Sequence, residues 1–214
     1  KEGGLIVADE VTSGLRVEKK LAVYKLGINP DIVVLGKSLG GGWAVAAVGC
    51  DYDHKITLED VFASSTFWTE RSGLLAGRLT IKRLSKWENF YEKLIKNSLS
   101  LRGSFIRSFN QSNIDIKINS LPTMMSYKFN FSDFDERESS ALFVNRLVKK
   151  GYLTSSTIYP TICHSPKESK FFSKNVLNTL KEIKIEINKS STEVRNNLNT
   201  LGFLERGFSR TQSL

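Results

Sequence analysis

Short apolar runs separated by polar turns dominate the first part of the chain. Residues 5–8, 32–35 and 44–48 are each continuously apolar, without polar residues at alternate positions. Continuous runs of this kind are typical of strands in a sheet that is covered on both faces, as parallel sheets are. We therefore expect a central, mainly parallel sheet, with a helix filling part of the gap at residues 18–24.

From residue 70 onward the apolar spacing becomes helical. The apolar positions Leu74, Leu75, Leu79 and Ile81 recur at helical intervals. After a break near Trp87 the same kind of pattern continues over residues 90–109. Two successive helices are therefore predicted, and we expect them to lead from a larger domain into a smaller one.

Beyond residue 110 the pattern mixes strands with helices. Residues 114–118 alternate like a half-exposed strand, and residues 123–131 have the composition of another strand. An amphipathic helix is predicted over residues 139–150, where Gly151 would end it. This mixture indicates a small α+β domain.

The last predicted helix has the clearest start signal. Ser165 is a suitable N-cap, Pro166 fits the first turn, and Glu168 completes a capping box. One apolar face follows, formed by Phe172, Val176, Leu180, Ile183 and Ile187. Residues after 190 are polar and weakly periodic, so we expect a tail that is loose or packs only in an assembly.

These patterns divide the chain into three parts. Residues 1–100 are expected to form part of a large domain together with the linking helix. Residues 101–190 are expected to form the small α+β domain, and residues 191–214 the tail.

Composition narrows the class of protein. The 214 residues are 40% hydrophobic and 25% charged, as in ordinary globular proteins, and the net charge is +9. Lysines are scattered among acidic residues, which indicates a solvated basic surface and no nucleic-acid partner.

No apolar stretch approaches the about 20 residues of a membrane span, and we expect no signal peptide. Two distant cysteines, Cys50 and Cys163, predict reduced thiols, no metal cluster and a cytoplasmic location.

Lys37 is the most unusual charged position. It directly follows the apolar run at residues 32–35 and precedes three glycines at positions 40–42. A phosphate-binding P-loop would need a glycine where Asp31 stands, and a dinucleotide fingerprint would need one at Val45. Neither of these phosphate-binding motifs therefore explains the lysine.

A lysine at the carboxyl end of a strand can serve as a covalent catalyst. Ligands of open α/β sheets bind at that end, and apolar walls make a lysine amine available for imine formation. Pyridoxal 5'-phosphate (PLP) also needs a carboxylate beside its ring nitrogen and hydrogen-bond donors for its phosphate. Asp9 ends an earlier strand and can meet the first need, and residues 64–66 can meet the second.

Three segments together resemble one known family. Residues 6–16, 27–42 and 65–71 match the motifs of the class III aminotransferases in order and spacing, and the branch most similar is that of glutamate-1-semialdehyde aminomutase. The resemblance implies an α/β protein, a fold-type-I PLP-dependent transferase. The chain would contain a partial large domain with a central, mainly parallel sheet and a small α+β C-terminal domain.

The resemblance also implies roles for individual residues. Lys37 resembles the Schiff-base lysine, which also transfers protons, and Asp9 resembles the partner of the pyridine nitrogen. Val11 corresponds to the residue that packs on the ring face, and Thr12 to a side chain near the ring hydroxyl. Thr66 resembles the threonine that binds the cofactor phosphate of the neighbouring subunit, which implies a homodimer.

Three functions remain open at this point. The first is transfer of an amino group between an amino donor and a carbonyl acceptor. The second is an aminomutase reaction, although residues 66–71 differ from the Gly-Thr-Leu-Ser-Gly-Asn-Pro segment of true aminomutases. The third is an inactive, folded or dimerising module, because family members are roughly twice as long and the chain resembles their C-terminal half. No role is assigned to Arg16, Tyr159 or His164.

Overall fold

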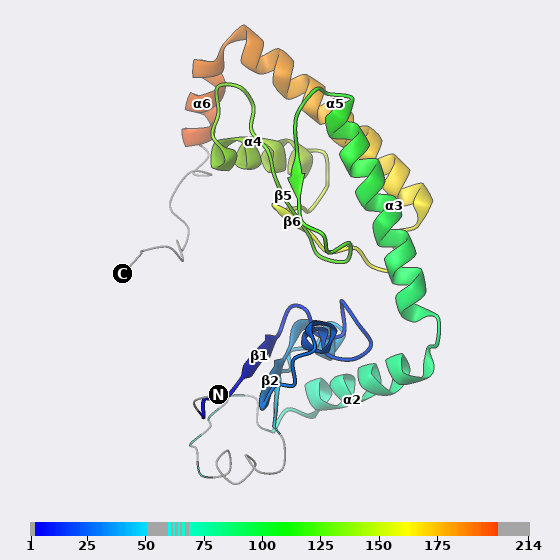
Figure 1. The fold of residues 1–214 in the computed structure, drawn as a ribbon. Coiled ribbons are helices and arrows are strands. Elements are labelled where there is room, and N and C mark those ends of the chain that lie inside the picture. The colour runs from blue at the N-terminus through cyan, green and yellow to red at the C-terminus, as the bar shows by residue number, and fades with distance from the viewer. Residues whose placement is uncertain are drawn as a thin grey trace. The chain divides into compact units, whose positions relative to one another are not determined.

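The structure is a computed structural model, and it describes residues 3–50, 60, 62, 64, 66 and 69–200. The chain divides into two compact units, Lys1–Lys93 and Leu94–Leu214 (Figure 1). Among the described residues, none of the helices combines the length and apolarity that a membrane crossing requires. Within the same part of the chain, no cluster of three or more His, Cys, Asp or Glu side chains is arranged to hold a metal ion.

The first unit contains a three-stranded sheet. Its strands are β1 (Val7–Glu10), β2 (Ile32–Leu35) and β3 (Ala47–Cys50), in the order β1-β2-β3. The β1–β2 pair is parallel, as expected, but β3 runs antiparallel to β2. The β2–β3 connection contains no α-helix that would return the chain along the sheet, so the strand direction reverses there. Strands 1 and 3 also begin later than the apolar runs predicted.

Short helices flank this sheet. The predicted helix at residues 18–24 is instead the 3-10 helix η1 (Ala22–Leu26), and a second one, η2 (Lys37–Gly40), follows β2. The helix predicted from residue 70 is confirmed as α2 (Arg71–Lys86). Glu70 caps it by accepting hydrogen bonds from the backbone N–H groups of Ser72 and Gly73.

The described residues of the second unit form three antiparallel strands and four helices. The strands are β4 (Lys117–Ile118), β5 (Met125–Lys128) and β6 (Thr157–Ile158), in the order β4-β5-β6. The helices are α3 (Phe90–Asn110, whose first turn belongs to the first unit), α4 (Glu136–Lys149), α5 (Pro166–Lys189) and α6 (Ser191–Thr200). The strands are shorter than predicted, and the α+β mixture is as expected.

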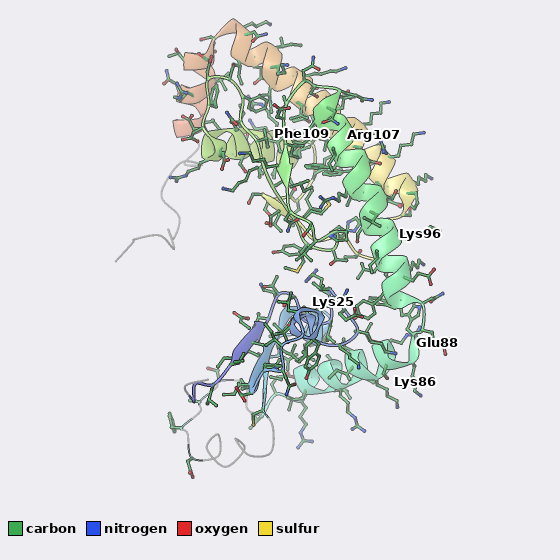
Figure 2. The ribbon with its side chains drawn as sticks, in the orientation of Figure 1. Lys25, Lys86, Glu88, Lys96, Arg107 and Phe109 are labelled. Carbon is green, nitrogen blue, oxygen red and sulfur yellow. The ribbon has the colours of Figure 1, made fainter. Side chains whose placement is uncertain are left out.

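Aromatic packing between helices and strands forms the core of the second unit. Phe105 and Phe109 of α3 and Phe143 of α4 are completely buried and lie edge-on or tilted against Tyr127. Helices α3 and α5 lie side by side (Figure 1), joined by a 2.8 Å hydrogen bond from Ser108 Oγ to the Ser173 carbonyl. Figure 2 labels the buried Phe109 and the exposed Arg107 on α3.

The helix ends follow their local sequence. Asp135 and Glu138 form a reciprocal capping box, which starts α4 before the predicted residue 139. Ser165 accepts a 3.5 Å hydrogen bond from the Glu168 N–H at the start of α5, as expected of an N-cap. The loose tail predicted after residue 190 is wrong for α6. Its Val194 and Leu198 are buried in the core because they occupy one helical face.

Candidate active site

Lys37 lies at the start of η2 in a strained backbone conformation. Its φ is 42°, a left-handed value that non-glycine residues adopt only when the surroundings hold them there. The side chain is exposed, and its Nζ donates a 2.5 Å hydrogen bond to Thr12 Oγ1. The fold therefore fixes the direction of a lysine that sequence alone places only after a strand.

Parallel pairing brings the other strand end to the same edge of the sheet. Asp9 pairs with Val34, and Glu10 pairs with Leu35. The carboxyl ends of β1 and β2 therefore lie next to each other, and the segments after them carry Thr12 and Lys37. Asp9 is exposed in β1 beside its last residue, and its Oδ1 accepts a 3.0 Å hydrogen bond from the Val11 N–H. That hydrogen bond restrains the Asp9 carboxylate through one of its two oxygens.

Val11, which follows β1, and Gly36, which precedes Lys37, lie close together. A Cβ added at Gly36 would lie 3.3 Å from Val11 Cγ1, so the glycine allows the valine side chain to approach the β2–η2 backbone. Val11 is half-buried. An apolar side chain from the segment after β1 thus lies beside the backbone that precedes Lys37.

Glu10 points away from this edge. It is 3% exposed and accepts hydrogen bonds from Ser13 Oγ and from the Val23 N–H, the latter at 2.7 Å. Alternation along β1 sends Asp9 and Glu10 to opposite faces of the sheet. The acidic pair therefore separates into one exposed carboxylate and one structural carboxylate that anchors the residue 10–14 turn and η1.

The turn after β1 admits no side chain at Gly14. A Cβ there would lie 2.6 Å from the Glu10 carbonyl oxygen and 2.5 Å from Leu35 Cδ2. Two residues later, Arg16 donates from Nε to the Thr12 carbonyl at 3.0 Å and from Nη2 to Ser38 Oγ at 3.1 Å. Arg16 thus joins the Thr12 turn to η2, a role that its position in the motif did not reveal.

Tyr91 anchors the same turn from a distant part of the sequence. Its hydroxyl donates a 3.0 Å hydrogen bond to the carbonyl of Leu15, which has a left-handed φ of 58°. Burial, with a smaller contribution from the Glu18 charge, raises the pKa of Tyr91 to about 12, so the hydroxyl remains a donor at neutral pH. The sequence contained no signal for this contact between residues far apart in the chain.

Helix α2 supports η2 through glycines rather than through its leucines. A Cβ at Gly73 would lie 2.5 Å from the Ala44 carbonyl oxygen, and one at Gly77 would lie 3.6 Å from Leu39 Cγ. Leu39 is 4% exposed, whereas Leu74 of α2 is 61% exposed. The close approach of the helix backbone therefore fixes the residues that follow Lys37.

The remaining predicted site residues lie outside this cluster. Thr66 is exposed in a turn, and among the described residues no hydrogen bond joins it to Asp9, Thr12 or Lys37. Its neighbour Ser65 lies outside the described residues. His164 belongs to the second unit, where its Nδ1 accepts a 2.8 Å hydrogen bond from the Thr161 N–H, and Tyr159 of that unit is 39% exposed.

The donor set fits a pyridoxal cofactor. The carboxylate of Asp9 can accept a hydrogen bond from a protonated ring nitrogen, and the primary amine of Lys37 can bond to an aldehyde carbon. The Val11 side chain, which lies beside Gly36, can supply an apolar surface for the ring. A lysine and a carboxylate that follow adjoining carboxyl ends of parallel strands are groups that a PLP site requires, at the edge where ligands of α/β sheets bind.

Comparison with known proteins identifies the family. The sequence model described as "Aminotransferase class-III" matches residues 1–163. The chain belongs to this family, which confirms the resemblance of its three motifs.

Curated relatives agree with the predicted branch. The chain is 30% identical over 179 residues to the glutamate-1-semialdehyde 2,1-aminomutase of Thermosipho melanesiensis, covering 81% of this chain and 41% of the relative. It is also 30% identical over 162 residues to the protein of the same name from Caldicellulosiruptor saccharolyticus, covering 73% of this chain and 38% of the relative. The chain thus spans about two fifths of the length of these relatives.

Solved structures confirm the fold. The PLP form of the FumI protein from Sphingopyxis sp. MTA144 superposes with a TM-score of 0.77 at 18% identity, covering 87% of this chain and 45% of that one. An ornithine delta-aminotransferase of Plasmodium falciparum gives a TM-score of 0.67 at 21% identity, covering 83% of this chain and 46% of that one. At these identities the likeness establishes a fold-type-I transferase architecture.

Proposed function

We propose that this chain carries the catalytic lysine of a PLP-dependent aminotransferase, which transfers an amino group from an amino donor to a carbonyl acceptor. The observation that carries the proposal is the Lys37 Nζ–Thr12 Oγ1 hydrogen bond of 2.5 Å beside the Asp9 strand end. Membership of the class III family supports the same reaction class. The activity belongs to the whole enzyme, and this chain matches about two fifths of the length of its curated relatives.

Each residue of the site has a distinct task in this proposal. When bound, PLP supplies an electron sink for the carbon that loses its proton. Lys37 would provide the amine that bonds to the cofactor aldehyde carbon, and its free Nζ would carry the proton. Thr12 accepts a hydrogen bond from that Nζ and limits the directions it can take. Asp9 would hold a proton on the ring nitrogen, and Val11 would supply apolar contact to the ring.

The proposed assembly is a homodimer in the cytoplasm. Thr66 would bind the cofactor phosphate of the neighbouring subunit, and its exposure in a turn supports a role outside its own Lys37 cluster. The partners are a small amino donor and a small carbonyl acceptor, with neither nucleic acid nor membrane involved. Crosslinking of Thr66→Cys subunits through a phosphate-directed PLP analogue would test the intersubunit contact.

An aminomutase reaction is the second candidate. It is favoured by the curated relatives, which are named glutamate-1-semialdehyde 2,1-aminomutase. Against it stands the segment at residues 66–71, whose sequence differs from that of true aminomutases. The two reactions separate in one assay, because only transamination needs an amino donor and a carbonyl acceptor as two different molecules.

The covalent role of Lys37 is tested directly with PLP. Purified protein is mixed with PLP, reduced with borohydride and digested, and the labelled lysines are identified by mass spectrometry. We expect preferential labelling of Lys37, and loss of the corresponding absorption band in Lys37→Ala. Lys86→Ala is the matched control, because Lys86 is an exposed lysine of the same unit on α2 (Figure 2). Equal labelling of Lys37 and Lys86 would favour the third possibility, an inactive folded module.

A further inference from the structure

Besides Lys37, Arg16 is a side chain that connects the two segments of the candidate site. Its Nε donates to the Thr12 carbonyl at 3.0 Å, and its Nη2 donates to Ser38 Oγ at 3.1 Å. Thr12 is the residue whose hydroxyl accepts the hydrogen bond from Lys37, and Ser38 directly follows Lys37. The guanidinium therefore contacts the segments on both sides of the Lys37–Thr12 hydrogen bond.

The geometry of these contacts suits arginine in particular. A guanidinium is planar and rigid, so two of its N–H groups keep a fixed spacing while they donate to two different acceptors. A lysine ammonium on its flexible chain could reach one of the acceptors but would not fix the distance between them. The Arg16 fork thus sets the separation of the Thr12 turn and η2.

Lys37 needs such a restraint because its backbone is strained. Its φ of 42° is a conformation of higher energy for a non-glycine residue, which persists only when neighbouring contacts hold it. Close packing at Gly14, Gly73 and Gly77 restrains the turn after β1 and the residues that follow Lys37. On the side of Thr12, the Arg16–Ser38 hydrogen bond joins the turn to the residue after Lys37.

We propose that Arg16 is a positioning residue for Lys37. By holding Thr12 and Ser38 at a fixed separation, it keeps the Lys37 amine at the edge where Asp9 and Val11 lie. This inference rests on the proposed function, because the amine must be directed toward a cofactor for its position to matter. Arg16 is the motif residue whose task the sequence left open.

The experiment measures how strongly PLP selects Lys37. The amine and the PLP aldehyde condense with loss of water, and borohydride then reduces the new carbon–nitrogen double bond to a stable secondary amine. Peptide mass spectrometry gives the ratio of labelling at Lys37 to labelling at Lys86 in one sample. That ratio cancels differences in protein amount and reagent. The variants are Arg16→Gln, Arg16→Lys, Ser38→Ala and the double variant Arg16→Gln/Ser38→Ala.

A matched control uses another arginine of the same unit. Arg83 lies over the Trp87 ring at 5.2 Å on α2, so Arg83→Gln removes one positive charge and one side-chain contact elsewhere in the unit. Thermal unfolding of every variant is measured in parallel. The unfolding temperature reports a general loss of stability, whereas the labelling ratio reports a change in the direction of the Lys37 side chain.

We expect the Lys37:Lys86 ratio to fall about tenfold in Arg16→Gln, the effect of losing a hydrogen bond from a charged donor. Ser38→Ala should lower it in the same direction, and the double variant should fall little further, because both changes break the same link. Arg16→Lys should restore part of the ratio, and Arg83→Gln should leave it unchanged. If Arg16→Gln does not fold, Ser38→Ala and its ratio decide the question.

Two results would overturn the inference in different ways. A wild-type preference for Lys37 that survives both Arg16→Gln and Ser38→Ala means that Arg16 only stabilises the fold, even if the unfolding temperature drops. A wild-type protein that labels Lys37 no better than Lys86 removes the proposed function itself, and the positioning role falls with it.

Discussion

The two units of the chain differ in how they are held together. In the second unit, Phe105, Phe109, Phe143, Leu147 and Leu180 are each 0% exposed and belong to one continuous core. Among the described residues of the first unit, the buried hydrophobic side chains are Ala8, Val17, Leu39 and Tyr91. The candidate site therefore lies in the unit with the smaller core, and the other unit supplies most of the buried apolar surface.

The first unit also has several large apolar side chains exposed on its surface. Val7 of β1 is 58% exposed, Val48 of β3 57% and Leu74 of α2 61%. Large exposed apolar areas on a folded unit mark surfaces that other protein covers. The first unit holds its site by other means: glycine contacts, the buried Glu10 carboxylate and the Arg16 and Tyr91 hydrogen bonds. Precise local geometry can thus exist in a unit with little hydrophobic core.

The largest expected effect lies in the aromatic core. Phe105→Ala should destabilise the second unit by about 3–5 kcal/mol, because it removes a fully buried ring that packs against Phe109, Tyr127 and Phe143. All three tryptophans, at positions 43, 68 and 87, precede Leu94. Far-ultraviolet dichroism should therefore detect the loss in urea before tryptophan fluorescence does.

Phe171→Ala is the control for that change. Its ring is 65% exposed on the same helix that contributes Leu180 to the core, so its removal should alter stability by no more than about 0.5 kcal/mol. Equal losses for Phe105→Ala and Phe171→Ala would contradict the contrast between core and surface.

A second prediction compares two helix glycines. Gly73→Ala places a Cβ 2.5 Å from the Ala44 carbonyl oxygen, and it should destabilise the first unit by about 1–3 kcal/mol through overpacking. Gly103→Ala on α3 meets only the Arg107 guanidinium at 3.4 Å, so the added methyl group should stabilise that helix by about 0.5–1 kcal/mol. Urea unfolding followed by fluorescence and dichroism measures both changes in stability. Stabilisation by Gly73→Ala would contradict the close approach of α2 to the Ala44 backbone.

A third prediction concerns the exposed leucines of the first unit. Leu75 is 56% exposed on α2, so Leu75→Gln should change the free energy of unfolding by no more than about 0.5 kcal/mol. It should nevertheless weaken self-association, measured by sedimentation velocity over a range of concentrations, because it removes apolar surface. A large loss of stability would show that this face of α2 is already covered in the protein.

The smallest effect is pH-dependent fraying of α2. Hydrogen bonds from the Gly73 and Ser72 N–H groups lower the pKa of Glu70 below its usual 4.5. The cap is therefore fully formed above the unfolded-state pKa, and it is lost as pH falls through the lower folded-state pKa. The amide shifts of Ser72 and Gly73 should report this in an NMR titration, and Glu70→Gln should remove the titration. Shifts that persist in Glu70→Gln would assign the effect to another group.

Local sequence patterns predicted the elements better than their contacts. The strand at residues 32–35, the helices after residues 70 and 90, and the Ser165 start of α5 all appear in the structure. The spacing of the α2 leucines predicted a helix but did not identify its buried side, which Gly73 and Gly77 form. That side has a physical cause, because a helix can approach another backbone closely only where it lacks side chains.

Part of the candidate site could be predicted in the same way. Asp9 and Lys37 each follow an apolar run, and parallel pairing of those runs brings the two strand ends to one edge. The side chains that hold this edge were not predictable. Glu10, Arg16 and Tyr91 act through backbone carbonyl and N–H groups of other segments, and such groups leave no signature in the sequence.

The sequence by itself determined the family, the order of the main elements and the types of residue at the sheet edge. These depend on local spacing and on motifs, which are readable along one chain. Only the tertiary structure decided that β3 runs antiparallel, that α6 packs on the core, and that Lys37 takes a left-handed backbone conformation beside Thr12. Those outcomes depend on contacts between residues distant in sequence, where side-chain volume and hydrogen-bond geometry must be satisfied together.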